Sequence, residues 1–345
     1  MRMSGTVSLS DFLIQGDEIR RLTDQIRNGR LPHALLITGP DGIGKKTLAT
    51  LVSCALLCTS EGDRPCGRCR ACLVSSKLEH ADQVLLRKGV PLSPEVREGR
   101  TTIPVEDVRE MIRICGMTPQ EGGSRTVLIF DAEAMTVQAQ NALLKTLEEP
   151  PEKTFFLLVT AHPEALLTTI ISRCRMIRLH ALPDERLLDL MRTNGVPEDL
   201  ALSVIPLADG SPGKAMEFVE REDLQERRRE ILEIFFQGEK RSEILTRSTQ
   251  WKNRKNEADF LFSVLESALH QMLGVRFGQM DENSLMASFP RQWNRFMHEA
   301  PPSAFSNLFE QILLAKRELQ YATNFQAVFE QVLFSFVGEG NRWLQ

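Results

Sequence analysis

Short apolar runs and amphipathic stretches alternate along the first half of the chain. The apolar runs are bounded by turn residues, which is typical of buried strands. They lie at residues 34–38, 83–87, 126–131, 155–160 and 176–179. Amphipathic helix patterns lie at residues 9–30, 48–52, 104–112 and 136–147. Strands that alternate with helices in this way predict a parallel α/β sheet.

The strand pattern ends near residue 180. Three short helix patterns with glycine breaks follow, and beyond residue 220 the chain reads as helices, with Leu261, Leu265, Leu269 and Leu273 at helical spacing. A chain of 345 residues exceeds what one compact domain usually holds. We therefore predict an α/β domain over residues 1–180, a small helical domain over 181–220 and a helical domain over 221–345.

The loop after the first strand has the form of a phosphate-binding loop. Residues 39–47 read Gly-Pro-Asp-Gly-Ile-Gly-Lys-Lys-Thr between a strand and a helix, the context that such a loop needs. Its glycines let backbone N–H groups converge on an anion, and Lys45 can reach the outer phosphates. Lys46 stands where a hydroxyl residue would hold Mg²⁺, and Thr47 is turned about 100° away on a helix. The candidate phosphate-site residues are Gly39, Gly42, Gly44, Lys45, Lys46 and Thr47.

Two further strand ends carry polar residues that belong to the same prediction. Asp131 has the position that orients Mg²⁺ in P-loop proteins, but Ala132 follows where a Glu would activate the attacking water. Glu133 comes one position late. The alternative role for Asp131 is a helix or turn cap. Thr160 ends the next strand, where its hydroxyl could probe a phosphate.

Four of the seven cysteines crowd into residues 58–72. They are Cys58, Cys66, Cys69 and Cys72, and two Cys-x-x-Cys steps share Cys69. In a reducing compartment this spacing favours metal over disulfides, and four thiolates complete a tetrahedral Zn²⁺ site. No further ligand or histidine pair lies nearby in the sequence, which favours a structural zinc over a hydrolytic one. The alternative is four reduced cysteines without metal.

The composition is that of a globular protein, with 42% hydrophobic and 26% charged residues. A formal charge of -4 and a pI near 6.0 disfavour strong nucleic-acid binding by this chain alone. No apolar run approaches the ~20 residues of a membrane span, and the N-terminal residues lack a signal-peptide core. We therefore expect a cytoplasmic protein.

Three stretches taken together resemble the clamp-loader branch of the AAA+ proteins. They are residues 33–47, the run Asn-Ala-Leu-Leu-Lys-Thr-Leu-Glu-Glu-Pro-Pro at 141–151, and Ser-Arg-Cys at 172–174. The run at 141–151 is highly specific, and the cysteine insertion is similar to that of bacterial DNA polymerase III clamp-loader subunits. The resemblance covers residues 9 to about 220. It implies an AAA+ RecA-like domain with a zinc knuckle at 58–72, a helical lid domain and a C-terminal helical collar domain for oligomerisation.

Within that family some subunits hydrolyse ATP, and another resembles them but has a disabled site. Three departures favour the disabled subunit: Lys46 replaces the hydroxyl residue, Ala132 replaces the activating Glu, and Gly213 replaces a sensing Arg. Each departure strikes a different part of one site. The resemblance therefore implies weak or absent ATP and ADP binding and no ATPase activity of this chain's own.

Arg173 of the Ser-Arg-Cys stretch is intact. In the family this arginine reaches the ATP of the next subunit, so the resemblance implies a catalytic role for Arg173 in trans. The alternative is a surface salt bridge. The implied partners are the gamma/tau and delta subunits, the sliding clamp and primed DNA, in a replisome at the nucleoid. Two other functions remain open, a hydrolysing gamma/tau-type ATPase and a zinc-dependent nucleic-acid-binding module.

Overall fold

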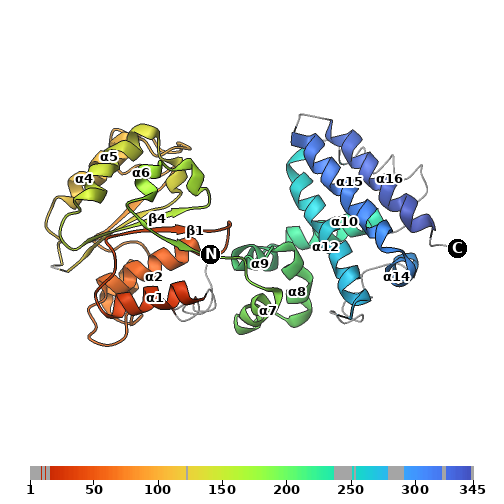
Figure 1. Ribbon diagram of the computed structural model, residues 1–345, viewed down its shortest axis with the longest axis horizontal. Coiled ribbons are helices and arrows are strands. Elements are labelled where there is room, and N and C mark those ends of the chain that lie inside the picture. The colour runs from red at the N-terminus through yellow and green to blue at the C-terminus, as the bar shows by residue number, and fades with distance from the viewer. Residues whose placement is uncertain are drawn as a thin grey trace. The chain divides into compact units, whose positions relative to one another are not determined.

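The computed structural model describes residues 9, 12, 16–121, 123–236, 251, 254–278, 291–320 and 324–342. The chain divides into two compact units, residues 1–183 with 211–213, and residues 184–210 with 214–345. The first is the α/β part and the second is the helical part (Figure 1).

The first unit contains a five-stranded parallel sheet with strand order β2-β3-β4-β1-β5. Its strands are β1 (Ala34–Thr38), β2 (Gln83–Leu86), β3 (Arg125–Ile129), β4 (Thr154–Thr160) and β5 (Arg175–Arg178). Its helices are α1 (Asp17–Arg27), α2 (Lys45–Leu57), α3 (Arg70–Ser75), α4 (Val105–Cys115), α5 (Val137–Glu148) and α6 (Thr168–Ile171), with 3-10 turns η2 (Ala132–Ala134) and η3 (Pro163–Ala165). The predicted parallel α/β class is confirmed, and all five predicted strands form. The predicted helix at residues 9–30 is confirmed over Asp17–Arg27, and part of it lies outside the described residues.

Helices cover both faces of the sheet because successive strand side chains point to opposite faces. On one face Leu35 and Ile37 pack with α1 and α2. On the other face Leu36 and Phe156 pack with α4, α5 and α6. Figure 1 shows α1 and α2 below the sheet and α4, α5 and α6 above it. A sheet buried on both faces explains why its strands read as continuous apolar runs.

Local signals set the starts of the two long helices on that second face. The Thr136 side chain accepts a hydrogen bond from the Ala139 N–H and caps α5, as its sequence position predicts. Pro104 precedes α4 and needs no amide partner there. The segments before the two helices form a parallel bridge between Ile103 and Met135, so both helices begin side by side.

The second unit is helical throughout its described part. Its elements are α7 (Asp184–Thr193), α8 (Glu198–Val204), η4 (Ile205–Leu207), α9 (Pro212–Glu220, which begins in the first unit), α10 (Glu222–Phe236), η5 (Lys255–Glu257), α12 (Ala258–Arg276), α14 (Arg291–Glu299), α15 (Pro302–Gln320) and α16 (Phe325–Arg342). Leu261, Leu265 and Leu269 are fully buried in its core, as their spacing predicts, and Leu273 packs against that core but is only partly buried. None of the helices described here has the length and apolar character needed to cross a membrane.

A buried ion pair fixes the chain between α4 and β3. Arg125 and Asp82 are 3% and 1% exposed, and their charged atoms lie 3.4 Å apart. Arg125 Nη1 also donates to the Ile114 carbonyl at 2.6 Å, and Asp82 accepts from the N–H groups of Gln120 and Glu121 at 2.7 and 2.9 Å. Backbone groups therefore add hydrogen bonds to each charge, which offsets part of the cost of burying it.

We expect Asp82→Ala to lower the free energy of unfolding by about 3–5 kcal/mol, because it leaves the Arg125 charge buried and unpaired. Urea denaturation measures this loss. Glu110→Ala is the matched control, because its ion pair with Arg113 at 2.7 Å lies at the surface. It should leave the denaturation midpoint unchanged. A loss for Asp82→Ala no larger than that of the control would contradict the structural role of the buried pair.

Candidate functional site

The parallel strands bring the predicted phosphate-site residues to one edge of the sheet. The loop at 39–44 follows β1, Asp131 follows β3, and Thr160 ends β4, which lies between β3 and β1. Thr38 and Thr160 are register partners. The carboxyl ends of neighbouring parallel strands share one edge, and this is where α/β proteins bind ligands. The topology therefore places the loop, Asp131 and Thr160 at one location.

The loop has a phosphate-loop backbone, but its lysine contacts the loop itself. Gly44 has φ 101° at the N-terminus of α2, a backbone conformation that residues with a Cβ rarely adopt. Lys45 is 7% exposed. Its Nζ donates to the carbonyls of Gly39 and Pro40 at 2.7 and 2.8 Å and lies 3.5 Å from Asp41. Burial lowers the pKa of Lys45, and Asp41 opposes that shift.

Lys46 and Asp131 form an ion pair. Nζ of Lys46 lies 2.9 Å from Oδ1 of Asp131, and the same ammonium lies 5.6 Å from the centroid of the Phe130 ring. The Asp131 side chain is 17% exposed and makes no capping hydrogen bond to η2. The alternative role of a side-chain cap is therefore wrong for this turn, and the carboxylate is held by the lysine instead.

Residue 213 packs directly on the phosphate loop. The Gly213 N–H donates to the Gly42 carbonyl at 2.9 Å, and a Cβ on Gly213 would lie 2.6 Å from that oxygen. Any larger residue would therefore have to push the loop aside. In this arrangement a sensing arginine has no room at position 213.

The remaining candidate residues are described by their burial and by their contacts within the protein. Thr160 is 1% exposed, and its hydroxyl accepts the His162 N–H at 2.9 Å. Thr47 lies in α2 and is half-buried. Oε2 of Glu133 is buried and has no hydrogen-bond partner within the described ranges. Lys45 donates to loop carbonyls and Lys46 pairs with Asp131, so a magnesium–nucleotide complex at this loop would have to replace both contacts.

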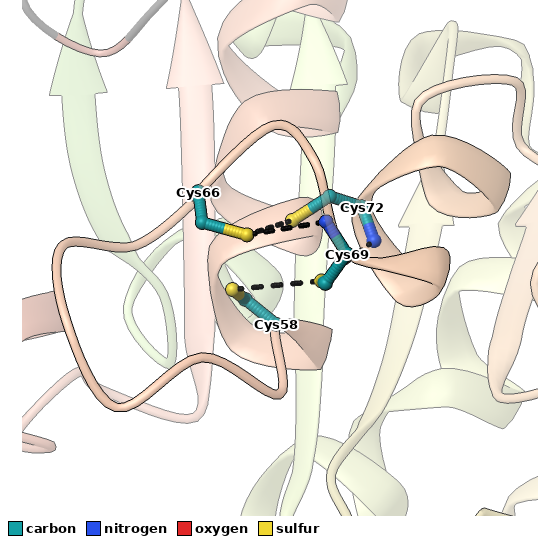
Figure 2. A group of neighbouring side chains, drawn as sticks. All are labelled: Cys58, Cys66, Cys69 and Cys72. Carbon is teal, nitrogen blue, oxygen red and sulfur yellow. Dashed lines mark hydrogen bonds between the residues drawn. The ribbon is translucent and has the colours of Figure 1, made fainter.

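The four predicted metal ligands converge on one point. The sulfur atoms of Cys58, Cys66, Cys69 and Cys72 all lie within 4.8 Å of one another, and Figure 2 shows them facing each other between the end of α2 and α3. The Cys58–Cys69 and Cys66–Cys72 sulfurs are 3.9 and 4.0 Å apart. A tetrahedral zinc with Zn–S bonds of about 2.3 Å has sulfurs about 3.8 Å apart. These cysteines can therefore hold a metal ion such as zinc.

The knuckle backbone supports negative charge on its sulfurs. The Cys69 N–H points at the Cys66 sulfur at 3.3 Å, and the Cys72 N–H points at the Cys69 sulfur at 3.4 Å. Burial opposes thiolate formation at Cys69, but hydrogen bonds from Cys72 and Thr59 prevail and lower its pKa to about 6. Burial raises the pKa of Cys72. A metal ion supplies the positive charge that would let Cys72 ionise as well.

Arg173 lies at the edge of the sheet opposite to the phosphate loop. It precedes β5, whose strand direction is that of β1, so it lies at the amino edge of the sheet. Its guanidinium pairs with Glu148 at the end of α5 and donates to the Thr169 carbonyl at 2.9 Å. His33, just before β1, contacts the Leu147 carbonyl at 2.9 Å, which confirms that α5 ends at this edge.

Sequence patterns did not reveal two partners in these sites. Glu148 is 25 positions away from Arg173 in the sequence. It lies in a run that the sequence pattern assigns only to the end of a helix. The Lys46–Asp131 pair was open to inference, because a lysine in a metal-binding position next to an acidic strand end suggests direct pairing. The distance between the two groups came only from the fold.

Comparisons with known proteins agree with these features. The family described as "DNA polymerase III, delta subunit" matches residues 14–183. The chain is 36% identical over 212 residues to the DNA polymerase III subunit delta′ of Escherichia coli, with 61% of each chain covered. It is 39% identical over 201 residues to that of Yersinia pestis, with 56% of each covered. A tau/gamma subunit of Haemophilus influenzae is 32% identical over 212 residues, which cover 60% of this chain and 29% of that protein.

Residues 14–183, just under half of the chain, match this DNA polymerase III family, and the chain is similar to delta′ subunits of DNA polymerase III. The matched part spans less than two thirds of the length of the two delta′ relatives named above. It contains the sheet, the phosphate loop, the four cysteines and Arg173. The predicted resemblance to the clamp-loader subunits of DNA polymerase III is confirmed, and these relatives support delta′ among them.

We expect the purified protein to contain about one zinc ion per chain, which metal analysis measures. Cys69→Ser should abolish zinc retention, because it removes one of four ligands and an N–H···S contact of the knuckle. Cys174→Ser is the control, because Cys174 lies outside the cluster, and it should retain the metal. Zinc affinity should fall as the pH is lowered, since protons compete for the thiolates. Full retention of zinc by Cys69→Ser would contradict the site.

Proposed function

We propose that this chain is a non-hydrolysing clamp-loader subunit of bacterial DNA polymerase III. In this role it supplies Arg173 in trans to a neighbouring ATPase subunit while the complex loads the sliding clamp on primed DNA. The neighbours would be gamma/tau and delta subunits, as the similarity to delta′ and tau/gamma subunits suggests. The observation that carries the proposal is the separation of Arg173 from this chain's own phosphate loop.

That separation follows from strand direction. The loop lies at the carboxyl edge of the sheet and Arg173 at the amino edge. The four residues of β5 alone span about 13 Å, which exceeds the reach of an arginine side chain from the far edge. Arg173 therefore cannot act on a nucleotide in its own loop. An arginine that serves phosphoryl transfer from this edge has to serve another chain's nucleotide.

The Arg173 side chain is positioned and still accessible. It is 32% exposed, and its two contacts with Glu148 and the Thr169 carbonyl use the terminal nitrogens. A guanidinium can donate to two phosphate oxygens at once, and such an arginine finger is worth about 10³ to 10⁵ in rate. A simple surface ion pair would contribute under about 1 kcal/mol to stability and nothing to a neighbour's activity.

The damaged pocket supports the non-hydrolysing half of the proposal. Ala132 is fully buried where a catalytic carboxylate would be needed. Lys46 holds Asp131, and Gly213 packs against the loop. The competing function is an active gamma/tau-type ATPase, and the 32% identity to a tau/gamma subunit supports this alternative. These three features of the pocket favour the non-hydrolysing subunit.

The proposed three-domain organisation assigns residues 181–220 to a lid domain and residues 221–345 to a collar that mediates oligomerisation. Large apolar side chains on α15 and α16 support the collar role, since apolar groups in contact with water favour burial against another chain. Leu313, Leu314 and Phe334 are 52%, 38% and 38% exposed.

Arg173→Ala should lower the ATPase rate of a reconstituted clamp-loader complex at least about 10-fold, because about 1.4 kcal/mol of transition-state stabilisation already corresponds to tenfold. The control is Arg192→Ala, which removes an exposed arginine that pairs with Glu198. Size-exclusion chromatography would confirm that both variants assemble. Equal ATPase rates for the two assembled complexes would rule out the role of Arg173 in trans.

The isolated chain should show no ATP turnover above background, because its pocket lacks the activating carboxylate. A coupled ATPase assay with magnesium measures this rate. Turnover near about 1 s⁻¹, at the low end of ordinary enzymes, would favour the gamma/tau-type alternative.

A further inference from the structure

The Lys46–Asp131 pair joins the two positions that hold magnesium in active phosphate-loop proteins. In those proteins a loop hydroxyl and a strand-end aspartate hold the metal together. Here the residue at the hydroxyl position is an ammonium that lies 2.9 Å from the aspartate oxygen. We propose that Lys46 is a tethered cation that takes the place of magnesium, so that this pocket excludes the metal and any polyphosphate in it binds without Mg²⁺.

The surroundings of the pair favour a persistent contact. Asp131 is 17% exposed, and partly buried charges are poorly screened by salt. The Lys46 ammonium also lies over the Phe130 ring, 5.6 Å from its centroid, which adds a cation–π attraction. Asp131 has φ 55°, a left-handed conformation that aspartate tolerates better than most residues. The carboxylate is thus held in a fixed turn beside a cation that cannot diffuse away.

A second ammonium at this edge lies near an acidic side chain. Lys45 lies 3.5 Å from Asp41 and is influenced electrostatically by Glu133. Asp41 therefore has an ammonium beside it, as Asp131 does. Magnesium binding needs oxygen ligands at about 2.0–2.1 Å and usually one or two carboxylates. To use Asp131, the metal would have to displace a covalently attached competitor of like charge.

The inference deepens the proposed function, since it rests on the inactive pocket and states how that pocket is kept free of metal. It also distinguishes two ways in which a phosphate loop can lose activity. A pocket that had merely lost a ligand would still bind magnesium weakly through Asp131. A pocket with a tethered cation responds to magnesium only after the lysine is removed and a hydroxyl is supplied.

The test measures ADP binding to the full zinc-loaded chain by calorimetry, in magnesium and in EDTA. For the natural chain, magnesium should change the ADP dissociation constant less than about 2-fold, whether binding is weak or undetectable. In Lys46→Thr, magnesium should tighten ADP binding at least about 10-fold, equivalent to about 1.4 kcal/mol. Lys46→Met is the matched control, because it removes the ammonium without supplying a hydroxyl, and its dependence on magnesium should stay below that of Lys46→Thr.

Two outcomes would overturn the inference: a natural chain that needs magnesium to bind ADP, or ADP binding by Lys46→Thr that magnesium does not tighten. If neither protein binds ADP, thermal unfolding of Lys46→Met, Asp131→Asn and the double variant decides. The pair predicts that the double variant loses less than the sum of the single losses in Tm, by about 2 °C or more. Additive losses would also overturn it. These measurements use the isolated chain, so their failure leaves the effect of Arg173→Ala on a neighbour's ATPase as a separate result.

Discussion

Both candidate sites depend on the direction of the strands in one parallel sheet. Each strand starts at the same edge, so residues that follow β1, β3 and β4 meet at the carboxyl edge, and residues that precede β1 and β5 meet at the amino edge. The phosphate loop and Asp131 are drawn together by this rule. Arg173 and the end of α5 are drawn together at the other edge. The direction of the strands therefore places the phosphate loop and Arg173 at opposite edges of the sheet.

The two edges have opposite chemical character. At the carboxyl edge both lysines have partners within the chain: Lys46 pairs with Asp131, and Lys45 donates to two loop carbonyls. At the amino edge, Arg173 has a carboxylate partner but keeps a third of its side chain in solvent. The lysines at the carboxyl edge are thus engaged within the chain, whereas the Arg173 guanidinium remains partly accessible. The similarity to delta′ subunits covers the part of the chain that contains both edges.

The sequence predicted correctly those features that depend on interactions between residues close together in the chain. The run Ala34–Thr38 is a strand with the predicted bounds, since only a strand covered on both faces is apolar throughout. Thr136 was recognisable as a cap, and the cysteine spacing predicted the convergence of four sulfurs. Contacts between distant segments were not predictable in this way. Gly213 was recognised as the loss of an arginine, but its backbone contact with Gly42 required the fold. Nor does any periodicity bring Glu148 to Arg173.

The close approach of the knuckle sulfurs also has a chemical consequence outside metal binding. Sulfurs 3.9 and 4.0 Å apart need to move only about 2 Å to reach the length of a disulfide bond. Cys69, with its pKa lowered to about 6, is a nucleophile among them, and backbone hydrogen bonds also lower the pKa of Cys66. A bound metal blocks that reaction by engaging the sulfur lone pairs. Exposure of the demetallated protein to air would then convert a reversible loss of metal into an oxidative cross-link, which only a reductant could undo.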